Sequence, residues 1–219
     1  MEPFHQCLAL GPVAIYLAML GVINLARRPL VVSGGRDVAA LGLAVSGLIF
    51  FGPVALLFPE GVAAHFGPAG TKYVWLMFVG LMVICLIVML LILRPRLIIY
   101  NISVDQLRPI LAEAVERLDP DAQWAGDCLF LPGLGVQLHL ESVGWMRNVS
   151  LVSSGPKQNY QGWSRLEVEL ATALRGIEVP WNISGLMLLS VGNALVIGLA
   201  WAIIHDPQAI ARTVFELLD

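Results

Sequence analysis

Charged residues are scarce in this chain of 219 residues, of which 13% are charged and 58% are hydrophobic. Soluble domains carry about 25% charged and about 45–50% apolar residues, so the composition is typical of a membrane protein. The net charge of −3 gives the chain no broad basic surface. Because phosphate backbones are bound by such surfaces, nucleic acid is excluded as a general partner.

Cysteine is also scarce, with Cys7, Cys85 and Cys128 in three widely separated segments. Residues placed so far apart do not reach disulfide distance, so three free thiols are predicted. The four histidines are scattered, and no pair of Cys or His has the spacing of metal ligands. A glycine-rich phosphate loop is also missing, so the sequence predicts neither a metal nor a cofactor.

Long apolar runs, in contrast, are abundant. A bilayer core of about 30 Å requires about 20 apolar residues in a helix. Runs of this length predict transmembrane helices at about 8–26, 38–58, 73–93 and 183–204. None of them contains Asp, Glu, Lys, Arg or His, residues that mark the paths of transporters and pumps. Transport is therefore disfavoured.

The predicted fold class is an α-helical multi-pass membrane protein with four transmembrane helices and one inserted α+β domain. Residues 1–94 form three transmembrane helices, and residues 95–181 form the inserted domain, with the order β-α-β-β-β-α. Residues 182–219 contain the fourth helix and a short amphipathic tail.

Basic residues predict the orientation of the chain. Arg27, Arg28 and Arg36 lie between the first two runs, and Arg94 and Arg96 follow the third. Because Lys and Arg accumulate on the cytoplasmic side, both termini are predicted outside and the inserted domain in the cytoplasm, in a cell (cytoplasmic) membrane. Four aromatic residues are predicted to anchor helix ends at the interfaces, namely Tyr73, Trp75, Trp181 and Trp201.

Small residues predict where the apolar helices pack, since they allow backbones to approach closely in lipid. In the fourth run they recur every four residues on one face, beside Asn193; these residues are Ser190, Ala194, Gly198 and Ala202. Ala14 and Ala18 are the small residues of the first run. Whether the row of the fourth run packs within the chain or against another copy stays open.

The inserted domain begins with a strand candidate at Leu97–Ile102, followed by a helix that Ser103 and Gln106 open with a capping box. A hairpin follows, with Trp124–Leu131 and Val136–Glu141 on either side of a Pro-Gly-Leu-Gly turn. A strand at Asn148–Val152 comes next. The last element is a helix with its apolar stripe at Trp163, Leu166, Leu170 and Leu174.

One pair in this domain could carry chemistry. If the hairpin closes at Gly133-Leu134, Cys128 lies opposite His139 on the same face of the sheet. An imidazole beside a thiol is how cysteine nucleophiles are activated. A small thiol in a strand is more often a packed residue, so this catalytic pair is a secondary hypothesis.

These observations favour a non-enzymatic scaffold or an assembly or regulatory subunit that docks partners through its cytoplasmic domain. The expected partners are the lipid bilayer and a protein or a second copy of the chain. The alternative is a membrane-tethered thiol enzyme or small-ligand sensor that uses the Cys128/His139 face. A third hypothesis, a transporter or channel accessory subunit, needs a polar path that only Tyr16, Asn24, Asn193 and a few serines could supply.

Overall fold

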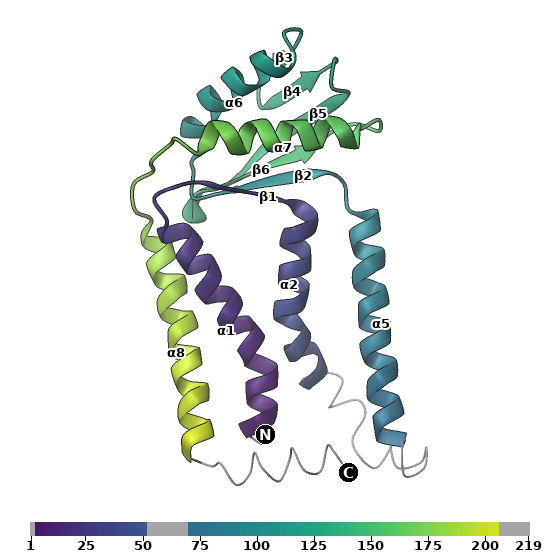
Figure 1. The fold of residues 1–219 in the computed structure, drawn as a ribbon, viewed down its shortest axis with the longest axis vertical. Helices are drawn as coiled ribbons and strands as arrows, with labels where there is room; N and C mark the ends of the chain where they lie inside the picture. The colour runs from purple at the N-terminus through teal and green to yellow at the C-terminus, as the bar shows by residue number, and fades with distance from the viewer. Residues whose placement is uncertain (1–2, 52–69, 206–219) are drawn as a thin grey trace. The chain divides into compact units, whose positions relative to one another are not determined.

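The computed structural model describes residues 3–51 and 70–205, which form six α-helices and six β-strands (Figure 1). The helices are α1 (Pro3–Leu25), α2 (Gly34–Ile49), α5 (Gly70–Ile92), α6 (Val104–Leu118), α7 (Tyr160–Leu174) and α8 (Ile183–His205). The strands are β1 (Leu30–Ser33), β2 (Arg96–Tyr100), β3 (Gln123–Ala125), β4 (Cys128–Leu131), β5 (Val136–Val143) and β6 (Asn148–Ser153). A short 3-10 turn, Gly144–Met146, joins β5 to β6.

The strands form one sheet in the order β1-β2-β6-β5-β4-β3, with every neighbouring pair antiparallel. Side chains alternate between the two faces of a strand, so a strand covered on one side shows alternating burial. β5 follows this rule through Val136, Leu138 and Leu140, which are buried, while Gln137 and His139 between them are half-buried. This alternation identifies the face of the β4–β5 hairpin that is covered.

The strand order differs from the predicted β-α-β-β-β-α in two places. The predicted strand at Trp124–Leu131 is two strands, because Gly126, with a φ of 65°, and Asp127 turn the chain between β3 and β4. In addition, β1 pairs with β2, although it belongs to the segment between α1 and α2. This strand has only four residues and is apolar without alternation, so its pattern did not distinguish it from the apolar runs beside it.

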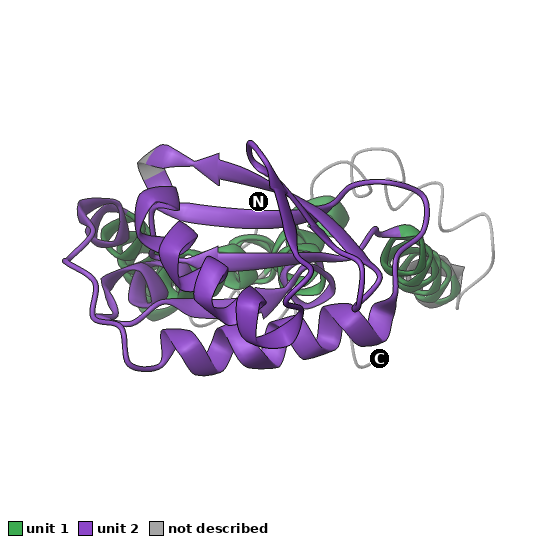
Figure 2. Cartoon of the chain, turned by 90° about the horizontal axis from the view of Figure 1, so that it is seen from above, with its two compact units in different colours: residues 1–19, 39–92, 188–219 green, residues 20–38, 93–187 purple. Residues whose placement is uncertain are grey.

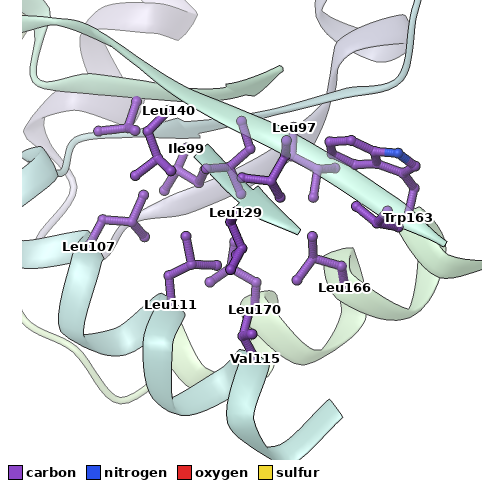
Figure 3. Packing of buried hydrophobic residues seen from close by; sticks show 14 of the residues in the cluster. Leu97, Ile99, Leu107, Leu111, Val115, Leu129, Leu140, Trp163, Leu166 and Leu170 are labelled. Carbon is purple, nitrogen blue, oxygen red and sulfur yellow. The ribbon is translucent and has the colours of Figure 1, made fainter. Parts of the chain in front are cut away.

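Helices α6 and α7 cover one face of the sheet and close the main hydrophobic core (Figure 3). The labelled side chains in that view come from α6 and α7 and from three strands. The predicted stripe of α7, Trp163, Leu166, Leu170 and Leu174, is buried, which confirms that prediction. Burying a leucine side chain contributes about 1.5–3 kcal/mol, so this layer dominates the stability of the sheet.

Both core helices begin at polar caps. α6 starts at Val104 with the predicted capping box of Ser103 and Gln106, and it continues through Pro109. α7 starts after Asn159, whose side-chain oxygen accepts a hydrogen bond from the amide of Gln161. Such caps satisfy backbone N–H groups that the first turn leaves without partners.

The chain divides into two compact units (Figure 2). One comprises residues 20–38 and 93–187 and holds the whole sheet with α6 and α7. The other comprises residues 1–19, 39–92 and 188–219 and holds most of the long apolar helices. Within the second unit, close approaches at Gly192, Gly47 and Gly42 bring α8 against α1, α1 against α2, and α2 against α5.

Two helices are long and apolar enough to cross a membrane, judged by length and composition: His5–Leu25 and Ile183–His205. They coincide with the first and fourth predicted spans. α2 and α5 lie where the second and third are predicted, and Leu76–Ile92 is a shorter apolar helix. The end of the second predicted span, 52–58, and the predicted amphipathic tail, 206–219, lie outside the described residues.

Candidate functional site

Cys128 and His139 lie opposite each other on the β4–β5 hairpin. The register pairs Leu131 with Val136 and Cys128 with His139, as the predicted turn requires. Cys128 Sγ lies 3.4 Å from His139 Nδ1, within hydrogen-bonding distance for sulfur. The register is fixed because Leu129, Leu131 and Leu138 all point into the core, and a slip by one residue would expose them.

This pair occupies the sheet face opposite the core. Both side chains are half-buried, and Glu141 follows on the same face as an exposed residue. Among the residues that the structure describes, no hydrogen bond joins Glu141 to the imidazole, and Nε2 of His139 has no partner. The arrangement supplies a nucleophile and a proton acceptor, without the third group that orients the base in catalytic triads.

The row of small residues on α8 does not pack against the residues that the structure describes. Ser190, Asn193, Ala194 and Gly198 are exposed, and Ala202 is half-buried. A Cβ atom added at Gly198 would meet nothing within 4 Å. The side-chain amide of Asn193 has no hydrogen-bond partner among the described residues. This face of α8 is therefore free for contacts outside the described chain.

α8 packs on α1 through a different face, which the sequence analysis missed. A Cβ atom at Gly192 would lie 2.7 Å from the Ala18 amide nitrogen and 3.0 Å from the Ala14 carbonyl oxygen. One heptad earlier, a Cβ at Gly185 would lie 2.9 Å from Asn24. The spacing of these two glycines was the available signal, and Ala14 and Ala18 of α1 were correctly identified as small packing residues.

A second site missed from the sequence lies at the start of α2. Asp37 accepts hydrogen bonds from the Tyr100 hydroxyl and from Arg96, whose Nη2 lies 3.4 Å from the carboxylate. Arg96 passes so close to Gly34 that a Cβ at that position would clash with its side chain. This contact ties the first turn of α2 to β2, and a side chain at Gly34 would force Arg96 to move.

Within the sheet unit, which includes the last turn of α1 and the first turn of α8, buried asparagines connect segments that are distant in sequence. The Asn182 amide donates to the Met146 carbonyl oxygen at 3.1 Å and to Asn24 Oδ1 at 3.5 Å, and its own oxygen accepts from the Ser184 backbone at 3.1 Å. Asn101, which has a positive φ of 61°, donates to the Ala26 carbonyl oxygen. These bonds satisfy the Asn182 amide and the Asn101 side-chain nitrogen, while the buried Asn101 side-chain oxygen has no partner among the described residues.

Asn101, Asn148 and Asn182 stand in Asn-x-Ser patterns, the acceptor sequence of N-glycosylation. Asn101, Asn148 and Asn182 are all buried, and each amide takes part in a hydrogen bond. A glycan on any of them has no room in this fold. The three asparagines therefore have structural roles in this fold and are not glycan acceptors.

The predicted interface anchors are exposed where their side chains are described. Tyr73 is exposed on α5, and Trp201 is exposed on α8, with its ring centroid 4.1 Å from that of His205. Trp181 is exposed just before α8, with the Arg27 guanidinium 5.8 Å from its ring centroid. The side chain of Trp75 lies outside the described atoms.

Within residues 3–51 and 70–205, no group of three or more His, Cys, Asp or Glu side chains is arranged to hold a metal ion. All three cysteines are free.

No protein-family model, curated protein or solved structure matches this chain. Its function has therefore to be argued from the residues themselves.

Proposed function

We propose that this protein is a four-span membrane protein with both termini outside the cell and its sheet unit in the cytoplasm. Two helices meet the length and composition of a span, and α2 and α5 are the remaining candidates. The loop arginines support the orientation. Arg27, Arg28 and Arg94 are exposed at the ends of α1 and α5 from which the chain enters the sheet unit.

Its proposed role is that of a non-enzymatic scaffold or assembly subunit. The observation that carries this proposal is the outward row of Ser190, Ala194 and Gly198 on α8, with Asn193 beside it and without a partner among the described residues. In lipid, small residues let a second helix approach closely, and an interhelical hydrogen bond adds about 0.6–2 kcal/mol. A row of this kind on an apolar helix fits the docking of another membrane helix.

The sheet unit supplies the second proposed docking surface. On the face opposite α6 and α7, Phe130 and Val143 are exposed apolar side chains, each 44% accessible. Phe130 pairs with Gln137 near the start of β5 and Val143 ends that strand, so they are two separate apolar points on this face. The proposed subunit thus binds one partner helix in the bilayer and a protein surface in the cytoplasm.

Crosslinking in native membranes tests the proposal, with the Gly198→Leu substitution compared against Gly80→Leu. Both glycines are exposed on long apolar helices, and a Cβ added at either meets no described atom within 4 Å, so the two positions are matched. The wild type and Gly80→Leu should migrate as a crosslinked complex. In Gly198→Leu the amount of this complex should fall at least about tenfold, because the loss of about 1.4 kcal/mol of packing energy weakens binding tenfold.

Mass spectrometry of the complex then shows whether the second component is another copy or a different protein, and whether residues 95–181 are crosslinked to it. Equal complex formation by both variants, or a wild type that is never crosslinked, would contradict the scaffold role.

A second candidate function, a membrane-tethered thiol enzyme or small-ligand sensor, is favoured by the 3.4 Å contact between Cys128 and His139. Two substitutions distinguish these functions. Cys128→Ser removes the thiol and leaves the α8 face intact, whereas Gly198→Leu alters the α8 face and leaves the thiol intact.

A further inference from the structure

We propose that Cys128 is a site of oxidation by small peroxides, with His139 as the group that accepts the thiol proton. This inference goes beyond the scaffold role, because it depends on neither the number of spans nor the identity of a partner. It requires only the two side chains and the strand pairing that holds them together.

The strand pairing holds the two groups in reactive geometry. Cys128 and His139 are direct cross-strand partners, so no loop motion is needed to bring Sγ within 3.4 Å of Nδ1. Leu129 and Leu138, the neighbouring pair, are fully buried beneath them. An antiparallel ladder with one face in the core resists slippage, so the contact persists in the folded state.

Access to the thiol favours a small reagent. Cys128 is half-buried, and its face of the sheet also carries exposed Phe130 and exposed Glu141. Asp127, the preceding residue, is engaged with Arg108 of α6 at 2.7 Å. A peroxide needs room for only two oxygen atoms at the sulfur, and a half-buried thiol leaves that room.

The step balances in atoms and electrons. Nδ1 of His139 accepts the thiol proton, and the Cys128 thiolate attacks one oxygen of the peroxide. The S–O bond forms as the O–O bond breaks, so sulfur loses two electrons and the peroxide gains them. The departing oxygen takes the proton back from the imidazolium and leaves as water, or as an alcohol from an organic peroxide. Sulfenic acid is the product.

The expected size of the effect follows from the proton transfer to His139. A positioned proton acceptor commonly contributes about 10²-fold or more to a step that includes proton transfer. Because Cys128 Sγ and His139 Nδ1 lie 3.4 Å apart, we expect Cys128 to react with hydrogen peroxide at least about tenfold faster than a cysteine in an unstructured peptide.

The test exposes the purified full-length chain to hydrogen peroxide, traps sulfenic acid with dimedone, and measures the rate at Cys128 by mass spectrometry. His139→Asn should lower this rate about tenfold. His205→Asn, which makes the same chemical change on α8, should leave it unchanged. Unaltered circular dichroism of each variant shows that the sheet is retained.

Two results would overturn the proposal: a wild-type rate equal to that of the peptide cysteine, or an undiminished rate in a folded His139→Asn variant. If His139→Asn does not fold, the wild type is compared with its own urea-unfolded chain, in which the pair is separated. Equal rates in those two states also overturn it. None of these outcomes depends on whether Gly198→Leu disrupts a complex.

Discussion

Single polar side chains hold together segments of the sheet unit that are distant in sequence. Asp119, buried at the end of α6, accepts a 2.7 Å hydrogen bond from the Gly133 amide and a 3.3 Å bond from the Asp121 amide. It thereby fixes the β4–β5 turn against the helix. Hydrogen bonds to a charged acceptor contribute about 1.5–3 kcal/mol, so this residue is a structural anchor of the hairpin.

Replacing Asp119 with alanine should lower the free energy of unfolding by about 1–3 kcal/mol, because two backbone donors lose their acceptor. Urea titration of the detergent-solubilised protein, followed by tryptophan fluorescence, measures the change. Asp121→Ala is the matched control, since Asp121 is exposed and should change stability by less than about 0.5 kcal/mol. Equal effects of the two substitutions would show that Asp119 is not an anchor.

At this scale the sequence predicted local pairings and missed distant ones. The Cys128–His139 register followed from turn length and strand alternation, both of which lie within a few residues of the pair. The contact of Asp37 with Tyr100 could not be predicted, because it depends on a strand pairing between segments on either side of α2 and α5.

Individual elements owe their roles to short features of the chain. β1 contributes only four residues, yet it covers the outer edge of β2, whose backbone groups would otherwise be exposed. α8 has small residues on two faces, one packed on α1 and one open. Composition alone could not show which of the two faces meets α1, because glycine, alanine and serine favour close helix packing equally in both places.

The pairing of β1 can be tested with engineered cysteines in a chain whose three native cysteines are replaced by alanine. Val32 and Ile98 are cross-strand partners, so Val32→Cys with Ile98→Cys should form a disulfide on mild oxidation. Gel mobility and mass spectrometry detect it. Val32→Cys with Ser150→Cys is the control, because Ser150 pairs with Ile98 and lies one strand farther away, about 9–10 Å from Val32. Efficient bonding of the control pair would refute the strand order.

The two faces of α8 predict opposite results for leucine substitutions. Gly192→Leu should destabilise the chain by about 1–3 kcal/mol, since its Cβ would lie 2.7 Å from the α1 backbone. Gly198→Leu should leave the stability of the isolated chain within about 0.5 kcal/mol. Thermal unfolding of the detergent-solubilised variants measures both, and a greater loss in Gly198→Leu would contradict the assignment of the faces.

The whole molecule joins a charge-poor set of apolar helices to a sheet unit that contains most of its charged residues. The positions of the long apolar helices and most elements of the inserted domain were predictable, because hydrophobic length and periodicity are local properties. The assignment of β1 to the sheet was not predictable from the sequence. It depends on where the chain stands after α2 and α5, which no local pattern reveals.

The proposed orientation predicts the activity of reporter fusions. Alkaline phosphatase, which folds only outside the cytoplasm, should be active when fused after Asp219 and inactive when fused after Gly155, a turn residue of the sheet unit. A cytoplasmic reporter, a fluorescent protein that fails to mature after export, should give the opposite pattern at the same two positions. Phosphatase activity in the fusion after Gly155 would show that the orientation is the opposite of the proposed one.

The pairing of β1 with β2 also has a consequence for biosynthesis. The ribosome completes β1 together with α1, and β2 appears only after α2 and α5 have been made. Until then the sheet has no central strands, and β1 has no hydrogen-bonding partner. In the topology proposed above, the sheet would close only after α2 and α5 have returned the chain to the side on which β1 lies. A chain in which either helix was misplaced would then keep an unpaired β2 edge, the kind of strand edge that invites pairing with other chains.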